Sequence, residues 1–160
     1  MRRTLTFLAA VAVAALLLLA GCGGDKRLSK DDYQKQMMEK VGAFVAATGK
    51  IDEATSSDSP RDVKVKALKD GRKAFDDAAD DLDDLSPPED VEEAHDLIVS
   101  GLRKYADDLE EPTKALEAGD EQRARDLLSA DPPFAGDFDR ATQIYTDKGY
   151  TDLVTFFNNS

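Results

Sequence analysis

The sequence predicts an all-α fold, an antiparallel up-and-down bundle of three long helices and one or two shorter ones. Apolar residues recur at spacings of three and four along several long segments, which is the period of one buried helical face. Short breaks containing Pro or Gly separate these segments, so neighbouring helices are expected to run in opposite directions. No segment shows the alternation of apolar and polar residues that is typical of a half-buried strand.

Residues 1–21 differ from the rest of the chain and predict a signal helix that is cleaved. Arg2 and Arg3 precede an apolar run from Leu5 to Leu19, and the segment contains no acidic residue. This is the profile of a secretory leader. The run is shorter than the roughly 20 residues that a transmembrane helix needs. The Arg2–Arg3 pair does not distinguish general secretion from twin-arginine export.

The leader ends in four residues that resemble the lipobox of bacterial lipoproteins, namely Leu19, Ala20, Gly21 and Cys22. The resemblance implies cleavage after Gly21 and a lipid on Cys22, which becomes the new amino terminus. Two or more acyl chains anchor a protein stably, since each buried methylene contributes about 0.8 kcal/mol. Cys22 is the only cysteine, so no disulfide can form within the chain.

The lipobox resemblance also implies where the protein resides, on the extracytoplasmic side of a membrane. Gly23, rather than aspartate, follows Cys22, which implies delivery to the outer membrane in a cell with two membranes. In a cell with one membrane, it implies the outer face of the plasma membrane. Residues 22–28 then form a lipidated polar tether, and residues 29–160 form one acidic helical-bundle domain.

Two long helices are expected in the first half of this domain. Ser29 and Asp32 have the spacing of a capping box, and the residues that then share one helical face are Tyr33, Met37, Val41, Phe44, Thr48 and Ile51. Ser59 and Pro60 predict the start of the second helix, with proline at its first position. That helix is expected to run to about Leu85, before the sequence Ser86-Pro87-Pro88.

The second half predicts one more long helix and the shorter ones. The third long helix is expected to run from Val91 to Leu109, with a kink or break at Pro112. Asp120 is expected to cap a short helix over residues 121–130. Residues 134–149 have helical spacing that ends at Gly149, which suits a left-handed cap. Residues 150–157 are expected to be helix or coil, because the sequence offers them no partner strand.

Several positions are similar to those of small helical lipoproteins of actinobacteria. They extend from Leu85-Ser86-Pro87-Pro88 through His95 and Leu102 to Tyr105, with Gly149-Tyr150 later in the chain. In several such proteins a cysteine follows the late glycine, where this chain has Tyr150. The resemblance implies an extracytoplasmic helical domain and assigns it no activity.

The charge of the chain excludes some partners. Removal of Arg2 and Arg3 with the leader takes the formal net charge from −12 to −14. Because nucleic-acid binding relies on clustered Lys and Arg, nucleic acid is not expected as a partner. Anionic lipid headgroups should also be repelled, which leaves the acyl chains on Cys22 as the membrane contact. We expect a monomer.

One acidic helical face is the most unusual feature of the domain. Aspartates oppose the apolar side of the second helix, and like charges four residues apart destabilise a helix. A solvated face explains them most simply. The alternative is a low-affinity site for divalent cations or a basic partner, formed by Asp76, Asp77, Asp80, Asp81 and Asp84. The spacing of a calcium-binding loop is absent.

His95 is the only histidine and the only candidate for imidazole chemistry. It falls at the margin of the apolar stripe, so a half-buried ring with a local hydrogen bond is expected. A mononuclear metal site with Glu92 and Asp96 is the alternative. The mature sequence has no serine-elbow motif and no phosphate-binding glycine loop. We therefore expect no catalytic residues, no cofactor and no enzymatic activity.

These observations predict a membrane-anchored extracytoplasmic lipoprotein with a non-enzymatic binding or scaffolding domain. Its partner would be an envelope protein that the sequence does not identify. The alternative is a carrier or sensor for a small ligand or cation. Such a ligand would lie between helices near Met37, Met38 and Tyr105.

Overall fold

A computed structural model describes residues 27–56, 58–130 and 135–159, and every regular element in these ranges is a helix. The long helices are α1 (Lys30–Ser56), α2 (Arg61–Asp83) and α3 (Glu92–Asp108), with a 3₁₀ turn, η1 (Glu89–Val91), before α3. The shorter helices are α4 (Glu110–Glu117), α5 (Glu121–Leu128), α6 (Ala135–Asp147) and α7 (Thr151–Asn159). The predicted all-α bundle is confirmed. The signal peptide, the lipobox from Leu19 to Cys22 and the tether as far as residue 26 lie outside the described residues.

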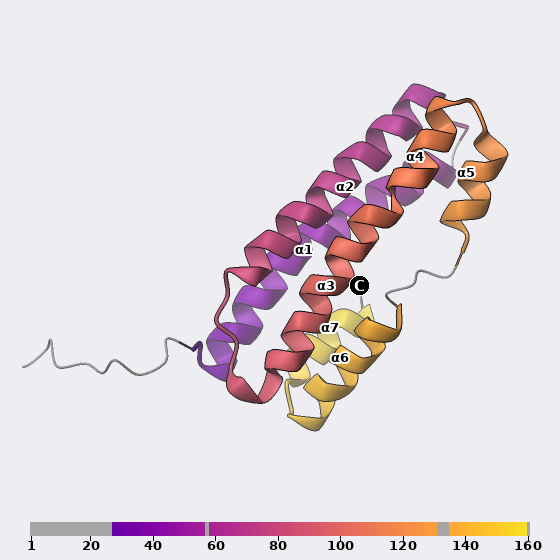
Figure 1. Ribbon diagram of the computed structural model, residues 1–160. Helices are drawn as coiled ribbons and strands as arrows, with labels where there is room; N and C mark the ends of the chain where they lie inside the picture. Colours follow the sequence, from indigo (N-terminus) through magenta and orange to yellow (C-terminus); the bar gives the residue numbers. More distant parts are fainter. Residues whose placement is uncertain (1–26, 57, 131–134, 160) are drawn as a thin grey trace, which may run out of the picture.

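The three long helices lie side by side and run alternately up and down, with α2 packed against both α1 and α3 (Figure 1). α4 continues beyond α3 and α5 folds back on it, at the end of the bundle away from the start of α1. α6 and α7 form a hairpin at the other end, where α6 packs on α3 and α7 on α1. Long-range contacts between helices therefore hold the hairpin on the three-helix frame.

The structure has four shorter helices in its described residues, rather than the one or two expected. One reason is that the helix break comes at Leu109, three residues before Pro112, and the chain then starts α4. Proline has no N–H to donate, but this costs little in the first turn of a helix, where N–H groups have no intrahelical acceptor. The second reason is that residues 151–159 form a separate helix, α7.

Two helices are terminated by a glycine with positive φ, as expected for Gly149. Gly149 has φ 70° and Gly119 has φ 83°. In each case the following residue donates a backbone hydrogen bond of 2.8 Å to a carbonyl five residues earlier, which is the pattern of a Schellman cap. Asp120 then caps α5 by accepting a 3.0 Å hydrogen bond from the Arg123 N–H. Pro60 differs from expectation by one residue, because it precedes α2 rather than beginning it.

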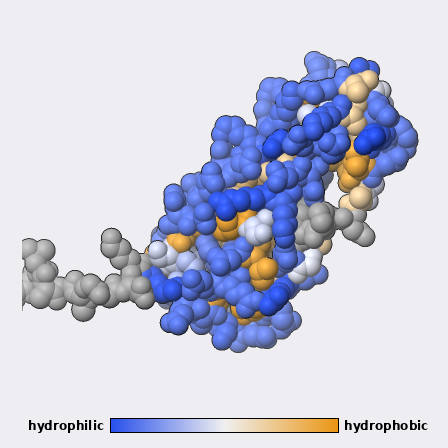
Figure 2. Space-filling view, viewed as in Figure 1, coloured by the Kyte–Doolittle hydropathy of each residue, from blue (hydrophilic) through white to orange (hydrophobic). Residues whose placement is uncertain are grey.

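The core is continuous along the bundle and comes mainly from the expected apolar faces. Its largest fully buried side chains include Tyr33 and Met37 of α1, Phe75 of α2 and Leu102 of α3. α1 and α2 approach closely at Gly71, where an added Cβ would lie 2.9 Å from Ile51 Cγ1. The outer surface in Figure 2 is mostly hydrophilic. None of the described helices combines the length and apolar composition needed to cross a membrane.

Candidate functional site

The aspartates that the sequence predicted as a possible cation site lie on the acidic face of α2. Three of them lie beside different basic side chains. Asp81 lies 3.6 Å from Lys40 Nζ on α1. On the other side, Asp80 lies 3.3 Å from Arg103 Nη2 on α3. Asp77 accepts a 2.6 Å hydrogen bond from Lys73, one turn earlier on α2.

The other two aspartates, Asp76 and Asp84, do not form a cation site with the first three. Asp76 is partly buried, and Asp84 is the residue that follows the last turn of α2. Within the part of the chain that the structure describes, no group of three or more His, Cys, Asp or Glu residues could hold a metal ion. The acidic face is thus a set of carboxylates spread around and along one helix, partly neutralised by basic side chains.

His95 is fully buried rather than half-buried, with an exposed fraction of 3%. The expectation was wrong because it came from projecting α3 alone, whereas the α6–α7 hairpin covers this part of α3. His95 Nδ1 lies 3.1 Å from the Tyr33 hydroxyl, which in turn lies 2.8 Å from the Tyr145 hydroxyl. The ring also makes a hydrogen bond with the backbone of Leu82.

These contacts are compatible with a neutral imidazole in the buried cluster Tyr33–His95–Tyr145. Burial lowers the pKa of His95 below its ordinary value, while the carboxylates of Asp96, Asp83 and Glu92 oppose the shift. In the neutral tautomer whose Nδ1 carries no proton, Nδ1 accepts a hydrogen bond from the Tyr33 hydroxyl, and the protonated nitrogen donates to the Leu82 carbonyl. The Tyr33 hydroxyl then accepts from Tyr145. Burial also raises the pKa of Tyr33 and that of Tyr145, so both stay protonated.

The cluster lies in the core of the bundle, unlike the other residues of the predicted metal site. His95 and the two tyrosines are all buried, and Tyr33 lies against the imidazole with ring centroids 5.8 Å apart. Glu92, a ligand in the alternative metal site, is exposed and pairs with Arg27 at 3.0 Å, and Asp96 is also exposed. The structure therefore does not assemble the mononuclear site. Instead, hydrogen bonds within the cluster join α1, α3 and α6.

The three residues near which a ligand site was expected, Met37, Met38 and Tyr105, lie in three different environments. Met37 is fully buried in the core. Met38 lines a shallow hollow on α1 and α7 that Phe156 also borders. Tyr105 packs against Phe75, with ring centroids 4.4 Å apart. The three side chains do not form one wall of a ligand site.

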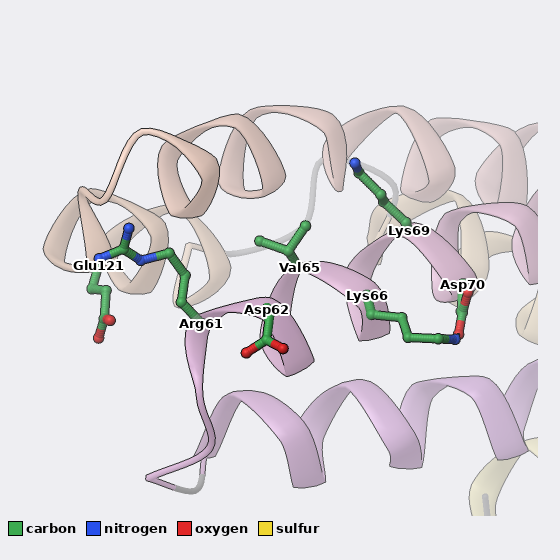
Figure 3. Close-up of a pocket in the computed structure, with 7 residues that line it drawn as sticks. All are labelled: Arg61, Asp62, Val65, Lys66, Lys69, Asp70 and Glu121. Atoms are coloured by element: carbon green, nitrogen blue, oxygen red, sulfur yellow. The ribbon is translucent and has the colours of Figure 1, made fainter.

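One large hollow lies at the start of α2, near α5, and has a volume of about 740 Å³. Figure 3 shows Lys66 and Asp70 pointing toward each other along α2, as expected for their ion pair. Lys69, which also borders the hollow, lies 2.6 Å from Glu117 Oε1. Lys64 lies 3.8 Å from Glu121, on the α5 side. The hollow is an open depression, and several of the charged side chains that border it form ion pairs.

A second hollow, with a volume of about 600 Å³, lies between α1, α6 and α7. Its aromatic lining comes from Phe44, Phe138 and Phe157, one from each helix, and its carboxylates are Asp52 and Asp139. The rest of the lining consists of Val45, Gly49 and threonine, asparagine and glutamine side chains, and it includes no Lys or Arg. Sequence reasoning missed this site because its walls come from segments about a hundred residues apart. We call it the α1–α6–α7 hollow.

No family model matches the chain, and comparison with curated proteins and with solved structures gave no match.

Titration of His95 should make the stability of the domain depend on pH. The folded-state pKa is lowered from 6.5, so the unfolded chain takes up the proton first as pH falls. The free energy of unfolding is therefore fully retained above pH 6.5 and declines as pH falls below that value toward the folded-state pKa.

Urea unfolding of the parent and of His95→Gln across this pH range measures the effect. Glutamine stays neutral and can both accept from Tyr33 and donate to Leu82, so the variant should lack this part of the decline. Equal pH dependence in the two proteins would contradict the assignment of a buried neutral imidazole.

Proposed function

We propose that the protein is a lipoprotein, anchored by a lipid on Cys22, whose helical domain binds or scaffolds a component of the cell envelope. The observation that carries the proposal is the sequence Leu19-Ala20-Gly21-Cys22 at the end of an apolar leader. A non-enzymatic role is supported by the lack of a recognisable catalytic motif in the sequence. It is also supported by the burial of His95, the single histidine, whose ring lies within hydrogen-bond distance of Tyr33.

The start of the domain is fastened in a way that suits an anchor. The Leu28 N–H donates a 2.8 Å hydrogen bond to the Ser86 carbonyl. Arg27 donates to the Pro87 carbonyl at 3.0 Å and pairs with Glu92 at 3.0 Å. These contacts fix the last two residues of the predicted tether, residues 27 and 28, to the connection between α2 and α3.

This fastening would set the orientation of an anchored domain. Four residues separate Cys22 from Arg27, and an extended chain spans at most about 3.6 Å per residue, so the two lie within roughly 18 Å. The end that holds the α2–α3 connection would thus stay close to the membrane. The 27 residues of α1 rise about 1.5 Å each, which would place the α4–α5 end about 40 Å farther out.

Lipidation of Cys22 predicts how the protein divides between detergent and water. The parent, expressed in a bacterial host, should enter the detergent phase of a Triton X-114 separation, because its acyl chains need an apolar environment. Cys22→Ser should remain unprocessed, with the mass of the uncleaved chain and no acyl groups. Gly24→Ser, a serine substitution two residues away, should behave as the parent does.

Intact mass spectrometry of the three proteins reads cleavage and acylation together. If Cys22→Ser is cut after Gly21 and enters the detergent phase as the parent does, the lipoprotein proposal is wrong.

The binding role predicts a partner in the envelope. Every core side chain of the described residues lies between Leu28 and Phe157, so a soluble form that begins at Gly23 retains this core. Used as bait in an envelope extract, this form should retain a specific protein. If the acidic face of α2 recognises the partner, higher ionic strength should release it.

Two charge variants of the bait locate the contact. Asp76→Asn/Asp84→Asn should weaken retention, whereas Asp58→Asn/Asp126→Asn, with the same change in net charge away from this face, should not. A bait that retains no protein at any ionic strength would contradict the binding role.

The alternative role, a carrier of a small ligand or cation, is favoured by one observation. This is the α1–α6–α7 hollow, whose volume of about 600 Å³ falls within the range of small-molecule sites.

A further inference from the structure

We propose that the α1–α6–α7 hollow binds a small organic cation, with an alkylated ammonium group seated among its aromatic rings. This inference does not rest on lipidation of Cys22 or on a protein partner. It rests on the chemistry of the side chains that three helices bring together at this place.

Three phenylalanines give the hollow its apolar walls. Phe44, Phe138 and Phe157 are each half-buried, so their rings are supported by the core and still reach the hollow. Phe44 packs on Phe75 with ring centroids 5.4 Å apart, and Phe157 packs on Tyr145 at 6.1 Å. Because the face of an aromatic ring is electronegative, rings fixed in this way attract cations.

Two carboxylates add negative charge from different walls. Asp52 comes from α1 and Asp139 from α6, and both are exposed. The basic residues next to this site on α3 and α6 are engaged elsewhere, since Lys104 lies 2.6 Å from Asp137 and Arg140 pairs with Glu93. The lining therefore has a formal charge that favours a cationic ligand and disfavours an anion.

The neutral part of the lining selects an organic cation over a metal ion. Two carboxylates are fewer than a metal centre needs, and the described residues contain no group of three or more possible metal ligands. Thr48, Thr142 and Gln143 can instead hydrogen-bond to a hydroxyl or amine on the ligand. Such a combination of rings, carboxylates and hydroxyls suits a quaternary ammonium compound with a polar arm.

Gly49 keeps the α1 wall of the hollow open. A Cβ added at this position would meet no atom within 4 Å, so the space in front of the glycine is empty of protein. Gly42 on the same helix is also open, but it does not line the hollow. The two glycines therefore provide a matched pair for testing whether filling the hollow blocks a ligand.

The probe is choline, and its control is 3,3-dimethyl-1-butanol, which has the same shape without the charge. Both are titrated into the ¹⁵N-labelled soluble form that begins at Gly23, at physiological ionic strength. Choline should shift the amides of α1, α6 and α7 around the hollow. Its dissociation constant should be at least about tenfold lower than that of the neutral compound.

Two pairs of variants test separately whether choline binding depends on the carboxylates and whether it depends on the open volume of the hollow. Asp52→Asn/Asp139→Asn should abolish the preference for choline, whereas Asp58→Asn/Asp126→Asn, which changes the net charge equally, should keep it. Gly49→Leu should weaken choline binding at least about tenfold, whereas Gly42→Leu should not.

Each of several results would overturn the inference. These are no amide shift with choline, equal affinity for the neutral compound, and shifts that lie outside the hollow. A preference for choline that survives in Asp52→Asn/Asp139→Asn, or unchanged binding in Gly49→Leu, would overturn it as well.

Discussion

The arrangement of the bundle depends on the hydrogen bonds that the buried Tyr33 hydroxyl makes with His95 and Tyr145. α1 and α3 both pack on α2, and the α6–α7 hairpin covers the groove between them. Tyr33 meets that hairpin directly, through the 2.8 Å hydrogen bond to Tyr145 and an edge contact with Tyr150 at 6.0 Å. Because a buried polar group without a partner is costly, the cluster with His95 favours this one position of the hairpin.

The position of the hairpin also determines the proposed binding properties. α7 has 9 residues and α1 has 27, so the hairpin covers only part of α1. The α1–α6–α7 hollow is lined by Phe157, near the end of α7, and by Phe44, in the middle of α1. If lipid on Cys22 anchors the domain, Phe44 lies 14 residues above the start of α1, about 21 Å along its axis. The hollow would then face the space outside the membrane.

The sequence predicted the helices and their caps, which depend on local pattern. It did not predict the features that form only when distant segments of the chain pack together. The caps at Gly149 and Asp120 follow from residue type, because few residues tolerate a left-handed turn or satisfy free N–H groups. The burial of His95 was not predictable from α3, since the hairpin that covers it lies 40 or more residues later. The ion pairs that divide the α2 aspartates depend on Lys40 and Arg103, which only the packing of the helices brings near. The hollow was missed for the same reason.

Native-state hydrogen exchange of Tyr33→Phe tests most directly whether the buried cluster holds the hairpin in place. The substitution leaves the Tyr145 hydroxyl and His95 Nδ1 without their shared partner, at a cost of about 1–3 kcal/mol. The amides of α6 and α7 should therefore exchange faster, with opening free energies lowered by this amount relative to those of α2. Tyr105→Phe, outside the cluster, should change α6 and α7 no more than α2. Equal changes in all helices of Tyr33→Phe, or none, would contradict this account of the fold.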